Sequence, residues 1–460
     1  MNRTVVGAAV AASLGVGALT AWALWSSLWG GPQVGHGADQ PPTVIFIVLD
    51  TVRADHTSLC GYDRPTTPVL DRLKADGASV SCGGVAPGGW TMPSHASYFT
   101  GLEVPDHGVE RRAGEGHNPL AAAWPVVPLG PEHPTLATVL AGRGYQTRGL
   151  SANPALAAET GLQAGFDAFA AAPSWQGRRS FRGEGFAPAL DALLADVEPG
   201  APLFLFVNVF DAHDPYPPIP AGVDWASPQV AVKLSGTGVD GPSRRFLDRR
   251  MEPGERAAFL THATDGYDWG IHQADAQIGV VLDALRARGA LDRPWRLIVT
   301  SDHGEYLGEH GLLRHGMFLY EPNQRVPILV ASSDRAVTAF PDPVSALVVH
   351  PLVLDGRLPD EPLPVRAAEA PHHANALFPI AAAASWDGDT KLSWLGDGRW
   401  ERYELAADPS ELAPIPLGDD PRRPAFEAFV DRAQATFARP AAADGGPELD
   451  ALLEGLGYTE

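Results

Sequence analysis

Four continuous apolar runs dominate the pattern of the chain. They comprise residues 43–49, 202–210, 296–300 and 326–331. A continuous apolar run of this length, rich in Val, Ile, Leu and Phe, predicts a strand that is buried on both faces, as in a parallel sheet. Each of the first three runs is followed at once by polar residues, so the sequence predicts buried strands with polar carboxyl ends.

Apolar residues at helical spacing separate these runs. Over residues 257–288, positions such as Ile271 and Ile278 recur at the spacing of one helix face. Shorter helices are expected over residues 69–77 and 135–143. Strands that alternate with helices indicate an α/β fold, with a mixed, largely parallel sheet flanked by helices.

The pattern changes near residue 366. Short alternating segments with Trp394, Trp400 and Tyr403 replace the long apolar runs. They predict a small antiparallel β subdomain, followed by a helix near 423–437. We therefore expect a catalytic domain over residues 43–365 and a small C-terminal α+β subdomain with a tail over 366–460.

Residues 1–30 predict a membrane anchor or signal segment. The chain carries no charge from Val5 to Leu28, and about 20 apolar residues suffice to span a bilayer. Arg3 before this run and Asp39 after it favour an extracytoplasmic body, periplasmic or at the cell surface. A cleaved signal peptide, and hence secretion, is the alternative. Residues 31–42 read as a linker.

The net charge limits the possible binding partners, and the cysteine count limits the possible disulfides. With 34 Lys and Arg against 55 Asp and Glu, the net charge is 34 − 55 = −21, which excludes nucleic acid as a long-range partner. An anionic substrate would have to be held by local dipoles and a metal. The two cysteines, Cys60 and Cys82, form one bridge in an oxidising compartment or stay free thiols, and the sequence leaves both open.

Three strand ends carry groups that suit a metal-assisted site. Asp50 follows the first strand, Asp211 and His213 the second, and Asp302 and His303 the third. The carboxyl ends of parallel strands meet at one edge of a sheet, where chemistry collects in α/β folds. Mixed carboxylate and imidazole ligands suit one divalent cation, Ca, Mg, Mn or Zn.

A candidate nucleophile lies in the segment from Thr91 to His95, which follows a Gly-rich lead-in. A loop that feeds a helix start favours anions, and a threonine hydroxyl there can attack once a base or a metal takes its proton. His95 acts on the substrate or braces the nucleophile helix, and both readings stay open.

Together these stretches resemble the sulfatase family of the alkaline phosphatase superfamily, in register from about residue 43 to 332. The resemblance is carried by residues 47–56, 61–68, 91–101, 211–216 and 301–311. It implies an alkaline phosphatase-like fold and a hydrolase of sulfate or phosphate esters that uses a divalent cation.

Carried over position by position, the resemblance assigns roles to six residues. Asp50, Asp302 and His303 fall on metal-binding positions, and Thr91 falls on the nucleophile position, which also contacts the metal. His213 falls on a histidine that faces the transferred group or the leaving oxygen. His315 occupies the position where many members have a substrate-binding lysine.

The chain also departs from the family pattern. Thr51 replaces the second of two adjacent aspartates, and Ser151 and Asn153 stand where the family has Lys-x-His. The oxidised nucleophile of the family needs Cys or Ser with Arg four positions on, whereas this chain has Thr91 and His95. No formylglycine is therefore expected.

These observations predict a metal-dependent hydrolase of sulfuric or phosphoric esters that attacks through Thr91. The alternatives are a membrane-anchored transferase of phospho-headgroups and a catalytically degenerate binding protein. The expected partners are an anionic ester substrate and a membrane at the N-terminal segment, with no nucleic acid. Three loops, residues 109–133, 171–187 and 220–250, are expected to select the substrate.

Overall fold

The computed structural model describes most of the chain after residue 39. The described residues are 40–110, 127–157, 160–173, 181–226, 241–333, 339–370 and 381–438. Among them, no helix combines the length and the apolar character needed to cross a bilayer. The predicted anchor, residues 1–30, lies outside the described residues, as does most of the linker 31–42.

An eight-stranded sheet forms the centre, in the order β10-β2-β9-β6-β1-β5-β3-β4. Its strands are β1 (Thr43–Leu49), β2 (Ser79–Val85), β3 (Gln146–Ser151), β4 (Ala168–Ala171), β5 (Leu203–Val209), β6 (Trp295–Thr300), β9 (Arg325–Ser332) and β10 (Val344–Ser345). β9 runs antiparallel to both of its neighbours, and the other pairings are parallel. The predicted mixed, largely parallel sheet is confirmed.

The strand register aligns the three polar strand ends. In β1, Val48 lies opposite Asn208 of β5 on one side and opposite Thr300 of β6 on the other. Parallel strands in this register end at the same edge of the sheet. The residues just after β1, β5 and β6 therefore meet there, as the sequence predicted.

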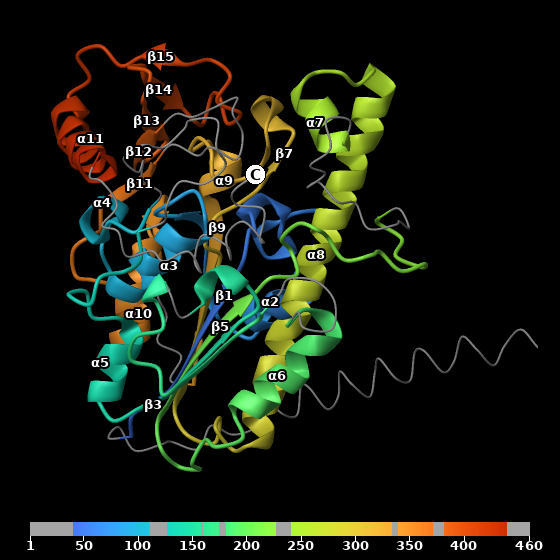
Figure 1. The fold of residues 1–460 in the computed structure, drawn as a ribbon, viewed down its shortest axis with the longest axis vertical. Coiled ribbons are helices and arrows are strands. Elements are labelled where there is room, and N and C mark those ends of the chain that lie inside the picture. Colours follow the sequence, from blue (N-terminus) through green and yellow to red (C-terminus); the bar gives the residue numbers. More distant parts are fainter. Residues whose placement is uncertain are drawn as a thin grey trace, which may run out of the picture. The chain divides into compact units, whose positions relative to one another are not determined.

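Helices cover both faces of the sheet, as Figure 1 shows. One layer contains α3 (Thr91–Thr100), α5 (Leu136–Gly142) and α10 (Val349–Asp355), and the other contains α2 (Pro68–Ala75), α6 (Phe186–Leu193) and α8 (Pro253–Ala287). Phe46 and Phe206 of the sheet are fully buried against Phe99 of α3 and Leu352 of α10. The predicted helices correspond to α2, α5 and α8, with ends that differ by a few residues.

A second, five-stranded sheet lies near the C-terminus, and all of its pairings are antiparallel. It consists of β11 (Val365–Glu369), β12 (Ala382–Asp387), β13 (Thr390–Leu395), β14 (Trp400–Glu404) and β15 (Ile415–Pro416), and α11 (Arg423–Phe437) follows it. Trp386 and Tyr403 of this sheet share a core with Val85 and Tyr306 of the main body. The antiparallel subdomain is confirmed, while its boundary at 365/366 stays a prediction.

Two local features position the site. The hairpin of β7 (Tyr306–Leu307) and β8 (Leu313–Arg314) follows β6 and turns through η7 (Glu309–Gly311). A disulfide joins Cys60 to Cys82 of β2, with their Cα atoms 5.7 Å apart. The bridge, which the sequence left open, fixes the loop after β1 to the strand that leads toward Thr91.

Candidate active site

Asp50 lies directly after β1 and is fully buried. Its Oδ2 accepts hydrogen bonds from Asn153 Nδ2 at 2.9 Å and Asn208 Nδ2 at 3.1 Å, whereas its Oδ1 has no hydrogen-bond partner among the described residues. Burial, together with the nearby charge of Asp302, raises the pKa of Asp50 to about 7. One oxygen is thus held in place and the other is left for a ligand.

Asp302 repeats this arrangement at the end of β6. Its Oδ1 accepts hydrogen bonds from the backbone N–H groups of Thr51 at 3.1 Å and His303 at 3.0 Å. Its Oδ2 is buried without a hydrogen-bond partner among the described residues. Burial raises the pKa of Asp302 to about 7. A nearby cation would offset this burial cost for both carboxylates.

Thr51 supports these two aspartates through its backbone. Its φ is +63°, which is unusual for a β-branched residue. Its N–H donates to Asp302, its hydroxyl donates to the Asp50 carbonyl at 2.7 Å, and its carbonyl accepts from the Tyr267 hydroxyl at 2.6 Å. The Thr51 side chain therefore bonds to the backbone and adds no carboxylate to the site.

His303 presents its Nε2 to the same space. Its Nδ1–H donates to the Gly304 carbonyl at 2.9 Å, which fixes the tautomer and leaves a lone pair on Nε2. That Nε2 lies 3.4 Å from Asp302 Oδ2. Burial lowers the pKa of His303 and keeps the ring neutral. A neutral imidazole is the form that binds a metal.

The three groups fit one divalent cation. Ligand atoms of Asp50, Asp302 and His303 all lie within 4.8 Å of one another. A buried polar atom without a partner costs about 1–3 kcal/mol, and a cation in this space would satisfy both carboxylate oxygens at once. Asp211, His213 and His315 form no such group in the described part of the chain, so nothing there supports a second metal.

Thr91 begins α3 beside this group and is fully buried. Its Oγ1 lies 3.5 Å from His303 Nε2 and accepts a hydrogen bond from Asn153 Nδ2 at 3.2 Å. The structure therefore brings the predicted nucleophile and the three predicted ligands together at the first turn of a helix, where an anion is favoured.

Asn153 and Asn208 are site residues to which the sequence analysis gave no role. The Asn153 amide donates to both Asp50 Oδ2 and Thr91 Oγ1, so one side chain links these two residues. The Asn208 amide donates to Asp50 Oδ2 as well. The only signal for Asn208 was its polarity within an apolar strand, and Asn153 stood out only as a departure from the family pattern.

His95 braces α3, the helix that begins at Thr91. Its Nδ1–H donates to the Thr91 carbonyl one turn earlier at 2.8 Å, and its ring packs edge-on against Phe99 and Phe206. Its Nε2 lies 3.5 Å from Asn208 Nδ2. Burial lowers the pKa of His95 to about 3, so the ring is neutral. These contacts favour the bracing role over direct action on a substrate.

His213 lies on the loop after β5. Its Nδ1–H donates to the Asp214 carbonyl at 2.6 Å, and its ring stacks on Phe210. Arg182, to which the sequence analysis assigned no role, is half-buried beneath this loop and donates to the carbonyls of Asp211, His213 and Pro215. Arg182 thus fixes the loop backbone and positions the His213 ring.

His315 completes the site from the residue just after β8. Its ring centre lies 4.3 Å from that of His303 and 5.1 Å from that of His213. Its Nδ1 lies 3.1 Å from Glu305 Oε1, and burial raises the pKa of Glu305 well above its usual value. Glu305 therefore holds a proton more tightly than an exposed glutamate does.

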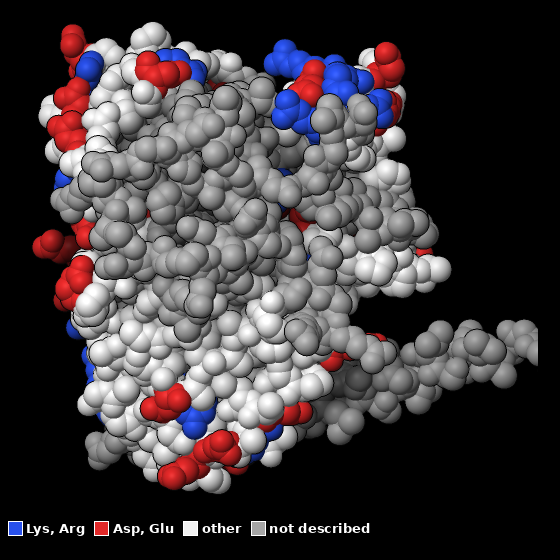
Figure 2. Space-filling model, in the orientation of Figure 1, with Lys and Arg blue, Asp and Glu red and all other residues white. Residues whose placement is uncertain are grey.

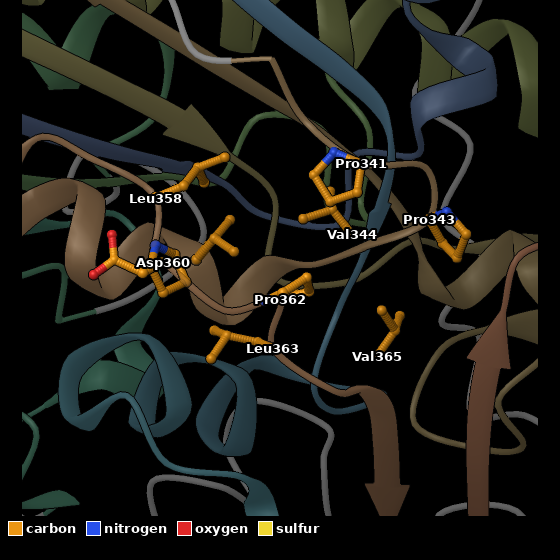
Figure 3. A pocket seen from close by; sticks show the side chains of 10 residues that line it. Pro341, Pro343, Val344, Leu358, Asp360, Pro362, Leu363 and Val365 are labelled. Carbon is orange, nitrogen blue, oxygen red and sulfur yellow. The ribbon is translucent and has the colours of Figure 1, made fainter.

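An apolar cavity of about 170 Å³ lies apart from these residues. Its lining includes Pro341, Pro343, Leu358 and Leu363, which Figure 3 shows around it, and it contains no predicted site residue. Of the loops expected to select the substrate, residues 111–126, 174–180 and 227–240 lie outside the described residues.

Solved structures share the fold. A protein solved with its substrate D-glucosamine-2-N,6-O-disulfate superposes with a TM-score of 0.59 at 16% identity, covering 86% of this chain and 98% of that one. The phosphonate monoester hydrolase of Agrobacterium radiobacter superposes with a TM-score of 0.58 at 18% identity, covering 86% and 95%. At these identities the likeness shows the fold alone.

Sequence comparison identifies the family as well as the fold. Choline-sulfatase of Rhizobium meliloti (strain 1021) is 30% identical over 186 residues, which is 36% of this chain and 35% of that protein, so the match spans about a third of the relative. The model of the sulfatase family matches residues 42–355, which is more than half of the chain. The chain therefore belongs to the sulfatase family.

Proposed function

We propose that the protein is a metal-dependent hydrolase of sulfuric or phosphoric esters with Thr91 as its nucleophile. The observation that carries this proposal is the position of the Thr91 hydroxyl, 3.5 Å from the Nε2 of His303 and bonded to the amide that also holds Asp50. Asp50, Asp302 and His303 would hold the cation. Once bound, the cation lowers the pKa of a coordinated hydroxyl and neutralises the non-bridging oxygens of the ester.

Groups of the chain prepare the attack. The first turn of α3 directs its backbone dipole at the reacting group, because Thr91 is the first residue of the helix. The Asn153 amide donates to Thr91 Oγ1, so it stabilises negative charge on that oxygen when the hydroxyl proton passes to solvent water. His95 holds the carbonyl of Thr91 and keeps the attacking oxygen in position.

The proton for the leaving oxygen comes from the pair of His315 and Glu305. As the bond from Thr91 Oγ1 to sulfur or phosphorus forms, the bond to the leaving alkoxide breaks, and this alkoxide takes the proton. His315 suits this role better than His213, because burial lowers the pKa of His213 well below its usual value and leaves that ring neutral.

Water must complete the reaction. As water attacks sulfur or phosphorus, it gives one proton back to the Glu305–His315 pair, and the bond to Thr91 Oγ1 breaks. Sulfate or phosphate leaves, and its remaining proton restores the Thr91 hydroxyl. Threonine cannot form formylglycine, so release through a hemiacetal is closed and the threonyl ester has to be hydrolysed. The proposed reaction applies to sulfuric and to phosphoric esters.

The test compares Thr91→Ala and Thr91→Ser with the wild type on 4-nitrophenyl sulfate, phosphate and bis-phosphate esters, with EDTA and with Mn, Mg, Ca or Zn. We expect metal-dependent release that falls by about 10³-fold or more in Thr91→Ala and that partly persists in Thr91→Ser, which keeps a hydroxyl. Full activity in Thr91→Ala would refute the threonine nucleophile, and the preferred ester defines the reaction.

We also propose an extracytoplasmic location for the catalytic body, anchored or secreted through residues 1–30. The disulfide between Cys60 and Cys82 supports it, because such bonds persist in oxidising compartments. The test is thiol labelling of protein taken from cells and denatured without reductant. Two labelled thiols per molecule would contradict this location.

A further inference from the structure

A basic segment interrupts the acidic chain beside the hairpin of the site. Residues 241–256 contain five arginines and three acidic residues, although the whole chain has a net charge of −21. They form α7 (Pro242–Leu247), the turn after it and the first residues of α8. Figure 2 shows the Lys and Arg side chains that gather over α7 and the adjoining end of α8.

A cavity of about 500 Å³ opens between this segment and the hairpin. Arg249 and Arg256 line it from one side and His310 of η7 lines it from the other, with Phe246 and Met251 as apolar walls. His310 is held flat against Tyr320, with ring centres 3.7 Å apart. The cavity thus combines two guanidinium groups and an oriented imidazole, a set of donors that suits an anion.

The backbone at this cavity is in an unfavourable conformation. Arg249 has φ +56° and occupies the position after the C-cap of α7, where glycine or asparagine is the usual residue. His310 has φ +54°. Only a few non-glycine residues adopt such angles, and they concentrate at ligand sites, where the surroundings enforce them. Two of them line this one cavity.

The cavity arginines differ from their neighbours in pairing. Arg244, Arg245 and Arg250 form ion pairs with Asp248 or Glu255. Within the described part of the chain, Arg249 and Arg256 form no ion pair, and Arg256 instead lies over the ring of Phe246 at 4.0 Å. Of the five arginines in this segment, the two that face the cavity are therefore the two whose charge no carboxylate of the described residues offsets.

The hairpin connects this cavity to the reacting centre. Its base carries His315, and its tip carries His310, so the two are separated by the length of a short strand and a turn, about 10 Å. Arg53, three residues after Asp50, donates to Glu309 at 2.6 Å and to the Glu305 carbonyl at 3.0 Å, which fixes both ends of the hairpin to the loop after β1.

From this geometry we propose that the cavity is a subsite for a second anionic group of the substrate. The substrate is then an ester whose alcohol part carries another sulfate, phosphate or carboxylate about 10 Å from the reacting group. This inference rests on the proposed function for the identity of the reacting ester. The subsite acts at short range, because the overall charge of the chain repels anions at a distance.

The test uses α,ω-alkanediol bis-sulfates and bis-phosphates of increasing chain length, each beside its ω-hydroxyalkyl monoester. For the wild type with metal, we expect one range of lengths at which kcat/KM for the bis-ester exceeds that for the monoester by about tenfold or more. In Arg249→Gly this ratio falls toward one, although glycine suits the positive φ and should keep or raise Tm. Arg244→Gln, which removes one charge outside the cavity, keeps the ratio.

A binding measurement separates this proposal from the proposed function. Isothermal titration of Thr91→Ala protein with the same bis-esters should show length-dependent binding that the added Arg249→Gly change removes. If the wild type cleaves no ester but this binding is found, the subsite stands and the proposed reaction fails. A ratio near one at every length, or equal losses in Arg249→Gly and Arg244→Gln, would overturn the subsite.

Discussion

Two groups of buried aspartates in this molecule differ in one respect. On α8, both carboxylate oxygens of Asp268 are bonded, one to His56 at 2.7 Å and the other to Tyr62 and Arg64 at 2.8 Å each. Asp275 likewise accepts from the N–H groups of Val69 and Leu70, at the start of α2. At the sheet edge, Asp50 and Asp302 each keep one oxygen without a partner among the described residues.

This difference distinguishes aspartates with a structural role from aspartates that can bind a cation. A buried carboxylate with all of its hydrogen bonds holds helices and loops together, and nothing further can bind to it. A buried carboxylate that leaves one oxygen pointing at a second such oxygen is costly unless a cation joins them. Burial alone therefore does not mark a functional aspartate, whereas an unmatched oxygen on each of two carboxylates whose ligand atoms lie within 4.8 Å of each other does.

The largest expected effect tests the sheet edge. In Asp302→Asn, the remaining carboxyl oxygen can still accept from Thr51 and His303, but the free oxygen becomes an amide. We expect kcat/KM to fall by about 10³-fold or more, with little change in the stability of the metal-free protein. A metal at 100 times its Kd should stabilise the wild type by about 2.7 kcal/mol, measured as a rise in Tm, and should not stabilise the variant.

If metal raised the Tm of Asp302→Asn as much as that of the wild type, the cation would have to bind elsewhere. That result would contradict the contrast between the two groups of aspartates. The matched control is Asp268→Asn, which alters an equally buried aspartate. Its Tm should rise with metal as in the wild type.

The second expected effect concerns stability on α8. Asp268→Asn removes the charge that faces Arg64 and His56, so we expect unfolding to become easier by about 3 kcal/mol. Urea denaturation measures this loss. Activity per folded molecule should fall less than tenfold. A variant of normal stability that has lost its activity would show that Asp268 takes part in the chemistry after all.

The smallest expected effect is a dependence of stability on pH. Burial raises the pKa of Asp275 to about 7, above its value in the unfolded chain. The native state therefore binds more protons than the unfolded state between about pH 4 and pH 7, and this contribution to stability is lost as pH rises through that window. One such group contributes a slope of up to about −1.4 kcal/mol per pH unit.

The measurement is the free energy of unfolding in urea at several pH values, in EDTA, for the wild type and for Asp275→Asn. We expect a less negative slope between pH 4 and pH 7 in the variant. An unchanged slope would mean that the two N–H donors already hold the pKa of Asp275 at its ordinary value. A cation bound between Asp50 and Asp302 would keep both ionised, and they would then add nothing to the negative slope.

Most of the fold followed from the sequence because its main strands are buried on both faces. β1, β5, β6 and β9 are long apolar runs, and α8 has clear helical spacing. β2 escaped notice because its sequence, Ser79 to Val85, is polar and contains two glycines. A side chain at Gly84 would come within 2.5 Å of the Val326 carbonyl, so close backbone approach, rather than apolar character, determines this strand.

The site was predictable where residues follow strand ends and less so where distant loops converge. The sequence predicted that Asp50, Asp302 and His303 lie close together because the carboxyl ends of parallel strands share one edge of the sheet. Asn153 depends on how far its loop reaches across β5, and no local pattern gives that distance. Arg182 lies in a loop expected to face the substrate, yet its guanidinium donates to three backbone carbonyl groups, which composition alone does not reveal.

The disulfide has a consequence for proteolysis. Gly61, Asp63 and Pro65 are exposed on the loop that the Cys60–Cys82 bond closes. A peptide bond cut between residues 60 and 82 would leave two fragments, one bearing Asp50 and the other bearing Thr91. The bond would keep those fragments covalently joined, so Asp50 and Thr91 would stay in one molecule even after a nicked chain unfolds, until a reductant cleaves the disulfide.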